Sequence, residues 1–179
     1  FLNYFFAFSQ GDFVVNSSRF LQKANPSYFG YNSVMKVGVL YNSIGIDSYN
    51  VINNKYAFGS IDFDNKKFSL GIHVNSFQIE NIGLNSSDAG LTYVYKIQLG
   101  NELYFLPSIT AGFSSRKLDP SGLIFGDQLN ASTGFINLES NDSFAGESFN
   151  VSDFGLGASF ILHNDVFLVG LSLQNLKGP

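Results

Sequence analysis

Two histidines, His73 and His163, are the side chains of this sequence best suited to acid–base catalysis or metal binding. They lie far apart, the chain contains no Cys, and no ligand spacing links them. His73 falls on the polar face of an alternating segment, and His163 falls where a turn is expected. We therefore interpret both as structural or solvent-facing residues, and the sequence predicts no metal site.

Other residues with chemical potential are also explained better by structure. Serines are numerous, but none stands in the Gly-x-Ser-x-Gly pattern of a nucleophile elbow. Asp62 and Asp64 could suggest a cation site, yet Lys66 and Lys67 follow directly, which is typical of a charged turn. Gly155 and Gly157 lie within a strand-like pattern and do not open a helix, unlike a nucleotide-binding loop. We therefore predict no enzyme, no catalytic residue and no cofactor.

Composition points to an all-β protein with a poorly charged surface. Of the 179 residues only 13% are charged, about half the usual share of a soluble domain. There are 20 Phe, 9 Tyr and 18 Gly, but no Trp, and the mean hydropathy is +0.09. The net charge is −4 and no basic run occurs, which disfavours nucleic-acid binding. No apolar run reaches the length of about 18 residues that a transmembrane helix needs.

The elements that would carry these residues are strands, and residues 91–113 are the clearest example. Apolar and polar side chains alternate over 91–99 and again over 103–113, with a turn at 100–102. Each arm has about the 10 residues that a tilted strand needs to cross a bilayer. The two arms therefore predict a hairpin with one apolar and one polar face. Pro107 is the weak point, because Pro within a strand usually marks an edge or a bulge.

The same alternation predicts about seven strands in all. They cover residues 33–41, 55–63, 68–74, 91–99, 103–113, 151–162 and 167–173. The connections alternate between short turns and longer loops, at 42–53, 82–88 and 116–150. Short turns on one rim and long loops on the other are typical of an up-and-down outer-membrane barrel. The sequence thus favours an antiparallel transmembrane β-barrel with a polar lumen, while a soluble β-sandwich stays open.

The two ends lead to further expectations. Residues 1–9 resemble the end of a signal peptide, with Ala7 and Ser9 at a small-x-small cleavage site, although an amphipathic strand is the alternative. Residues 10–32 are expected to form an N-terminal periplasmic segment, and 33–179 a partial barrel. Since single-chain bacterial barrels have an even number of strands, we expect a fragment that lacks strands after Pro179. A strand at 12–22 would be another source of an eighth strand.

Several segments, in order, resemble the PorP/SprF family of Bacteroidota, which is associated with type IX secretion and gliding. The first is Gln10, Gly11 and Asp12, followed by the Asn-Pro segment with Asn25, Pro26, Tyr28 and Gly30. The others are residues 90–99 with Leu103 and Tyr104, then 121–127, 153–158 and 169–176. Their order and spacing carry the resemblance over most of residues 10–176.

The resemblance implies an outer-membrane barrel that helps export or anchor surface adhesins with particular C-terminal domains, without enzymatic activity. Its expected partners are outer-membrane lipid, an adhesin C-terminal domain and other type IX secretion components. The loops at 116–150 and 42–53 would present the binding surface. Two alternatives remain, a passive porin and a soluble β-sandwich binding module. The porin is less favoured because the polar faces carry mainly Gly, Ser and Thr with scattered Lys.

Overall fold

The computed structural model describes residues 20–45, 51–80, 82–129, 134, 136, 139–174 and 176, and confirms an all-β fold. The predicted signal-peptide remnant lies outside these residues. The strands are β1 (Lys36–Gly45), β2 (Val51–Phe63), β3 (Phe68–Ile79), β4 (Leu84–Tyr95), β5 (Ile97–Gln98), β6 (Tyr104–Leu118), β7 (Phe149–His163) and β8 (Leu168–Leu173). The short helices are α1 (Leu21–Ala24), η2 (Pro26–Ser33), η3 (Asp64–Lys66), η4 (Pro120–Gly122) and η5 (Gly126–Gln128). No described helix has the length and apolarity to span a membrane.

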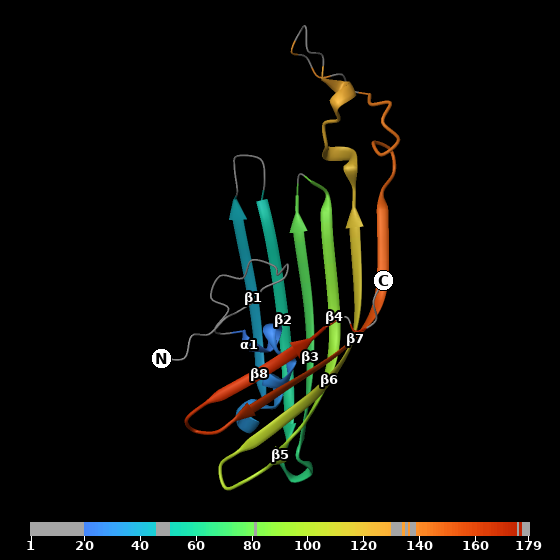
Figure 1. Cartoon of the computed structure of the whole chain (residues 1–179). Helices are drawn as coiled ribbons and strands as arrows, with labels where there is room; N and C mark the ends of the chain where they lie inside the picture. The colour runs from blue at the N-terminus through green and yellow to red at the C-terminus, as the bar shows by residue number, and fades with distance from the viewer. Residues whose placement is uncertain are drawn as a thin grey trace.

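All strands belong to one antiparallel sheet in the order β1-β2-β3-β4-β6-β7-β8, with β5 paired to β6. The sheet curls into a half-barrel, so that β7 and β8 sweep across in front of β1 to β3 (Figure 1). A β-sandwich would need two sheets packed face to face. The described strands form one sheet only, so the architecture is that of an up-and-down barrel fragment.

Pro107 explains why β4 and β5 are separate elements. The pairing of Val94 with Ser108 and of Ile97 with Phe105 follows one continuous register, so the two pieces form one strand without a bulge. Only Tyr95 and Lys96, the residues opposite Pro107 and Leu106, are not paired with β6. Since Pro has no N–H to donate, the gap follows from its chemistry. The hairpin of residues 91–113 is therefore confirmed, with its interruption at the position that the sequence marks as weak.

The strands are longer than their alternation predicts. Residues 42–45 and 51–53, expected in a loop, belong to β1 and β2, and the loop expected at 82–88 shrinks because β4 starts at Leu84. In these parts the runs 42–43, 53–54 and 85–88 are polar on both faces of the sheet, so the alternation is interrupted there. Between β3 and β4 the backbone N–H of Gly83 donates to the carbonyl oxygen of Glu80 at 3.2 Å, and Gly83 has φ +66°, a value that favours glycine. The described part therefore has one long connection, 119–148.

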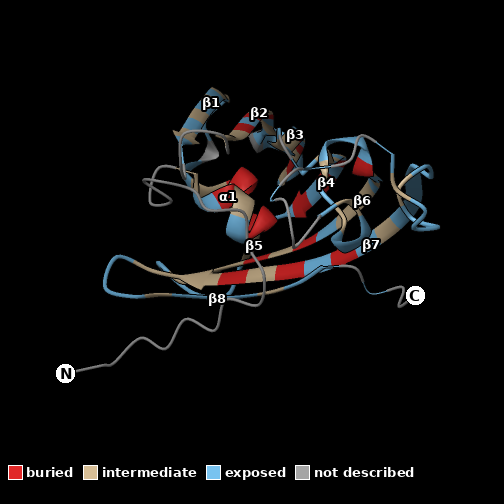
Figure 2. Ribbon diagram, turned by 90° about the horizontal axis from the view of Figure 1, so that it is seen from above, coloured by how far each residue is buried: buried red, intermediate tan, exposed pale blue. Residues whose placement is uncertain are grey.

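The register assigns every strand residue to a concave or a convex face. The convex face carries an apolar band of exposed side chains over the lower part of all the long strands. Its largest exposed members are Val37, Val39, Tyr41, Ile61, Phe63, Ile72, Val74, Leu91, Tyr93, Tyr95, Ile109, Phe113, Phe154, Leu156, Val169, Leu171 and Leu173. The concave face carries many small and polar residues together with the apolar Val94, Leu106 and Ile161, and η2 packs against it with α1 beside it inside the curve (Figure 2).

The small core lies between these inner helices and the sheet. It is formed by Phe29 from η2 and by Val94, Leu106 and Ile161 from three neighbouring strands. The inside of the curl is therefore packed at this level.

Candidate functional site

The apolar band is the first functional surface, because exposed hydrophobic residues cover a continuous outer face. Val37 is 80% exposed and Ile109 is 63% exposed. Patches of this extent on a soluble monomer would be unusual, whereas a lipid-facing barrel wall requires them. Above the band, the same outer face carries polar residues such as Asn85 and Ser87 on β4. The band thus has an upper limit partway along the strands.

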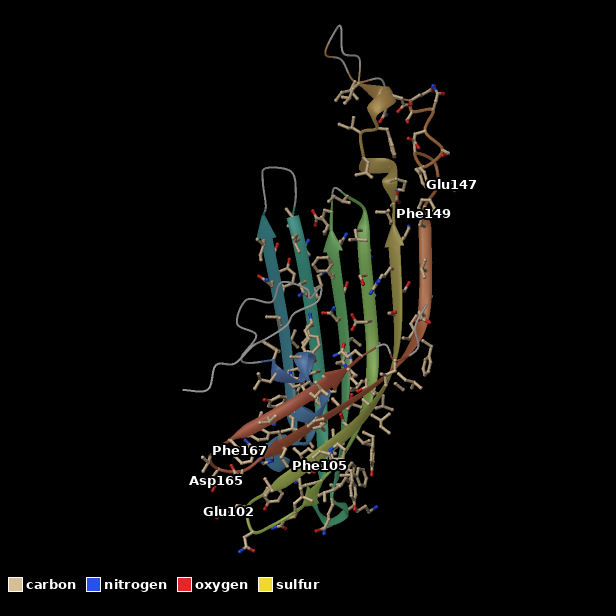
Figure 3. All side chains as sticks on the ribbon, viewed as in Figure 1. Glu102, Phe105, Glu147, Phe149, Asp165 and Phe167 are labelled. Carbon is tan, nitrogen blue, oxygen red and sulfur yellow. The ribbon has the colours of Figure 1, made fainter. Side chains whose placement is uncertain are left out.

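Aromatic rings strengthen the lower edge of the band. Phe68 stacks against Phe63 at 4.8 Å between ring centroids and against Tyr93 at 5.4 Å, across three strands. Figure 3 shows Phe105 and Phe167 near this edge, with Glu102 and Asp165 on the turns beyond them. Tyr104 also lies near this end of β6, but it faces inward and stacks on His163 at 5.4 Å, so it is no part of this edge.

The inner segment, defined here as residues 20–33, brings the family-like motif to the concave face. Asn25 Nδ2 donates to the carbonyl oxygen of Phe160 on β7 (3.0 Å) and lies 3.4 Å from that of Leu171 on β8. Asn25 Oδ1 accepts from the backbone N–H of Ser27 at 3.0 Å, and Pro26 occupies the start of η2. One asparagine thereby fixes the local turn and joins it to two strands.

Ser27 is the centre of a hydroxyl cluster that sequence reasoning did not find. Its Oγ lies 2.9 Å from Ser108 Oγ of β6 and 3.0 Å from Ser159 Oγ of β7, and these two are 2.5 Å apart. All three residues are buried, with Ser27 at 0% exposure. Among the described residues these hydroxyls bond to no histidine or acidic side chain, so the cluster holds chain segments together and forms no triad.

The remaining motif residues fit closely against the sheet. The ring of Phe29 lies where a Cβ on Gly71 of β3 would be, at 2.3 Å from it. A Cβ on Gly30 would come within 2.8 Å of Val94 Cγ1. Tyr28 packs edge-on against Tyr31, with 5.7 Å between the ring centroids. The motif therefore has a packing role, since a larger side chain at either glycine would displace the inner segment.

His73 and His163 both point to the concave side but do not meet in one site. His73 Nε2 lies 3.7 Å from Asp88 Oδ2, and its ring is stacked near Phe29. Asp88 also accepts from Asn75 Nδ2 at 3.0 Å. His163 is the last residue of β7 and does not itself lie in the following turn. No group of three or more potential metal-ligating side chains occurs in the described ranges.

The arm, defined here as residues 119–148, projects beyond the strands between β6 and β7 (Figure 1). Its two legs are joined near the middle, where Leu129 bridges to Ile136 and Asp127 accepts from Ser140 Oγ (2.8 Å) and Asn141 N (2.6 Å). These hydrogen bonds lower the pKa of the Asp127 carboxyl below its usual 3.8. The described part of the arm is thus organised by its own contacts.

The arm exposes apolar and acidic side chains together. Ile124, Leu129 and Phe144 are 57–59% exposed. The arm contains five carboxylates, Asp119, Asp127, Glu139, Asp142 and Glu147, while residues 118–176 contain no Lys or Arg. Figure 3 shows Glu147 at the end of the molecule opposite Glu102 and Asp165. The arm is therefore an acidic, partly apolar surface beyond the apolar band.

Comparison with protein families supplies the functional context. A family model described as "Type IX secretion system membrane protein PorP/SprF" matches residues 18–178. No curated protein and no solved structure shows a significant match. The matched range includes the inner segment, the arm and every described strand.

Proposed function

Since the chain belongs to the PorP/SprF family of type IX secretion system membrane proteins, we propose that it retains a secreted adhesin at the cell surface. The family is located in the outer membrane and works as a component of a secretion system. In the proposal, the barrel wall anchors the protein in lipid and the arm binds the C-terminal domain of the adhesin. The protein is a scaffold in this scheme, with no catalytic residue and no cofactor.

The observation that carries the proposal is the arm, because it combines reach, internal order and exposed anchor residues. It projects past the polar upper strands and away from the lipid-facing band. Exposed Ile124, Leu129 and Phe144 provide apolar surface that a partner could bury. Apolar and aromatic anchors inside a polar rim are typical of binding energy hot spots. The contacts between Asp127 and the opposite leg lower the entropy lost on binding.

The charge of the arm indicates the chemistry of the partner. Five carboxylates and no basic residue within the arm favour a partner surface that carries Lys or Arg around apolar pockets. The same charge disfavours insertion of the arm among anionic lipid headgroups. Charge at the rim chiefly raises the association rate, whereas buried apolar anchors chiefly slow dissociation. The two kinds of residue therefore give separable kinetic effects.

The first test replaces two exposed arm anchors, Ile124→Ser and Phe144→Ser, in the protein expressed from its own gene. We expect roughly tenfold weaker retention, because losing anchor contacts typically costs more than about 1 kcal/mol. The measurement is the ratio of adhesin on washed cells to adhesin in the medium. Outer-membrane level and the heat-shifted gel band of the folded barrel serve as controls.

A charge test separates the arm from the opposite rim. Glu139→Lys with Glu147→Lys should slow adhesin capture, whereas Glu102→Lys with Asp165→Lys adds the same charge at the other end. Replacing the whole arm by an unrelated loop of equal length should abolish retention. Normal retention by a folded barrel with a foreign arm would refute the assignment of the binding surface.

A further inference from the structure

We propose that the inner segment, residues 20–33, is a plug that stays seated in the barrel in the membrane and closes its lumen to small solutes. The proposal goes beyond adhesin retention, because it concerns what the barrel lets through. It also separates this protein from a passive porin.

The first argument is the level at which the inner segment sits. Its contacts on the concave face include Gly71, Ser108 and Ser159. On the convex face, the neighbouring positions include Ile72 and Ile109 of the apolar band. Since side chains alternate across a strand, inner and outer neighbours lie at the same height. The inner segment therefore fills the curl at the depth of the lipid-facing wall.

The second argument is that water does not reach the sheet beneath the inner segment. Leu106 and Ile161 are 0% exposed, Val94 is 1% exposed and Thr92 is 0% exposed, although all four face the lumen side. A diffusion pore needs a wet, polar lumen lining along its whole length. Over β4, β6 and β7 the lining is dry at this level, so no aqueous path follows these strands.

The third argument is the specificity of the seat. Withdrawing Ser27 would break its hydrogen bonds to the hydroxyls of Ser108 and Ser159, and withdrawing Asn25 would break its bond to the Phe160 carbonyl. Gly71 provides the notch for the Phe29 ring, and a Cβ on Gly170 would lie only 2.8 Å from Asn25 Nδ2. Leaving buried polar groups without partners costs free energy, and the spaces at Gly71 and Gly170 match the shapes of the Phe29 and Asn25 side chains. A seat matched at both polar and apolar positions indicates a fixed plug.

A cross-linking experiment tests the position of the plug in the native outer membrane. The chain has no Cys, so Ser27→Cys with Ser108→Cys introduces the only pair. The Ser27 and Ser108 oxygens are 2.9 Å apart, which brings the Cβ atoms within reach of a disulfide. We expect nearly complete cross-linking in cells under mild oxidation, seen as a shifted unreduced band after denaturation.

The matched control pairs Ser27→Cys with Ser86→Cys. Ser86 also faces the lumen side, but it lies eight residues further along β4 than Val94, the partner of Ser108, or about 26 Å. This pair should remain unlinked. A folded barrel in which the Ser27–Ser108 pair fails to link, or in which both pairs link equally, would overturn the proposal.

A permeability experiment tests closure. The purified protein in liposomes should admit no more sucrose than protein-free liposomes do. The variant Asn25→Ala, Ser27→Ala, Phe29→Ala loosens the seat and should increase sucrose entry several-fold while keeping the heat-shifted band. Sucrose entry through the unmodified protein refutes the plug, and a folded variant as tight as the parent refutes closure by this segment. Adhesin retention, measured in parallel, reports on the arm independently.

Discussion

The lower and upper parts of the strands have the same backbone pairing but carry different side chains on the outer face. On the outer face of β4, Leu91, Tyr93 and Tyr95 form part of the apolar band, whereas Asn85 and Ser87 continue the same row upward. The pairing with β3 and β6 runs through both parts in one register. Backbone pairing alone therefore does not determine which part of the sheet lies in the membrane. The apolar outer side chains determine it, and the plug fills the inner side at the same level.

The upper part is held by dispersed polar contacts in place of a core. At the upper limit of the apolar band, Tyr41 OH donates to Asn53 Oδ1 at 3.2 Å. Farther along the strands, Asn53 Nδ2 donates to Glu80 at 2.8 Å and Ser115 donates to Asn150 at 3.2 Å. All of these contacts are exposed, and exposed hydrogen bonds add little net stability. Substitutions should therefore be tolerated in the upper part and costly in the lower part.

The largest difference should come from placing a charge on each part of the outer face of β4. Leu91→Lys puts an ammonium group into lipid and should destabilise the barrel by about 2–4 kcal/mol. Asn85→Lys, six positions up the same face, should stay within about 0.5 kcal/mol. Urea titration of the heat-shifted band in vesicles measures both. Equal costs would mean that the apolar band does not face lipid.

A smaller difference in stability is expected when one glycine on each face of the lower part is replaced by alanine. Gly71→Ala forces a Cβ to within 2.3 Å of the Phe29 ring and should cost about 1–3 kcal/mol. Gly59→Ala, on the outer face of β2, meets nothing closer than 3.8 Å and should be close to neutral. The same urea titration compares them. Combining Gly71→Ala with Phe29→Ala should recover part of the loss, and failure to do so would argue against the notch.

The smallest expected effect is a local loss of stability of the arm at acid pH. Because folding lowers the pKa of Asp127 below its unfolded value of 3.8, its contribution is present above that pH and disappears as the pH falls through the lower, folded value. Limited proteolysis between pH 5 and pH 2 with an acid-stable protease should show faster cleavage of the arm at the acid end, with the strands still protected. Asp127→Asn should remove this pH dependence. Equal acceleration in the strands would contradict a local effect.

Sequence patterns could predict the lower part of the sheet because its lipid-facing positions are apolar, whereas most of the lumen-side positions between them are small or polar. Residues 91–113, with the weak point at Pro107, show this directly. The upper strand ends were missed because short runs such as 42–43, 53–54 and 85–88 are polar on both faces and interrupt the alternation. There the strands continue because their backbones remain paired, and this pairing leaves no alternation in the sequence.

The sequence indicated the segment that forms the plug but not the residues that hold it. The segment with Asn25, Pro26, Tyr28 and Gly30 stands out as family-like, but its seat consists of residues far along the chain. Small lumen-side residues, such as Gly71, Ser108 and Gly170, were a usable signal, because they leave space that another segment must fill. Sequence alone does not identify that segment, since the hydroxyl contacts join residues 81 and 132 positions apart.

The long reach of Asn25 also fixes an order of assembly. Its partners on β7 and β8 lie 135 and 146 residues later in the chain. The two hydrogen bonds of Asn25 can therefore form only after the last described hairpin is in place, whereas Phe29 of the same segment can already meet Gly71 of β3. Contacts of such separation are slow to close. The Asn25 carboxamide gains its partners on β7 and β8 last, so its closure of the seat reports that the whole described wall has been assembled.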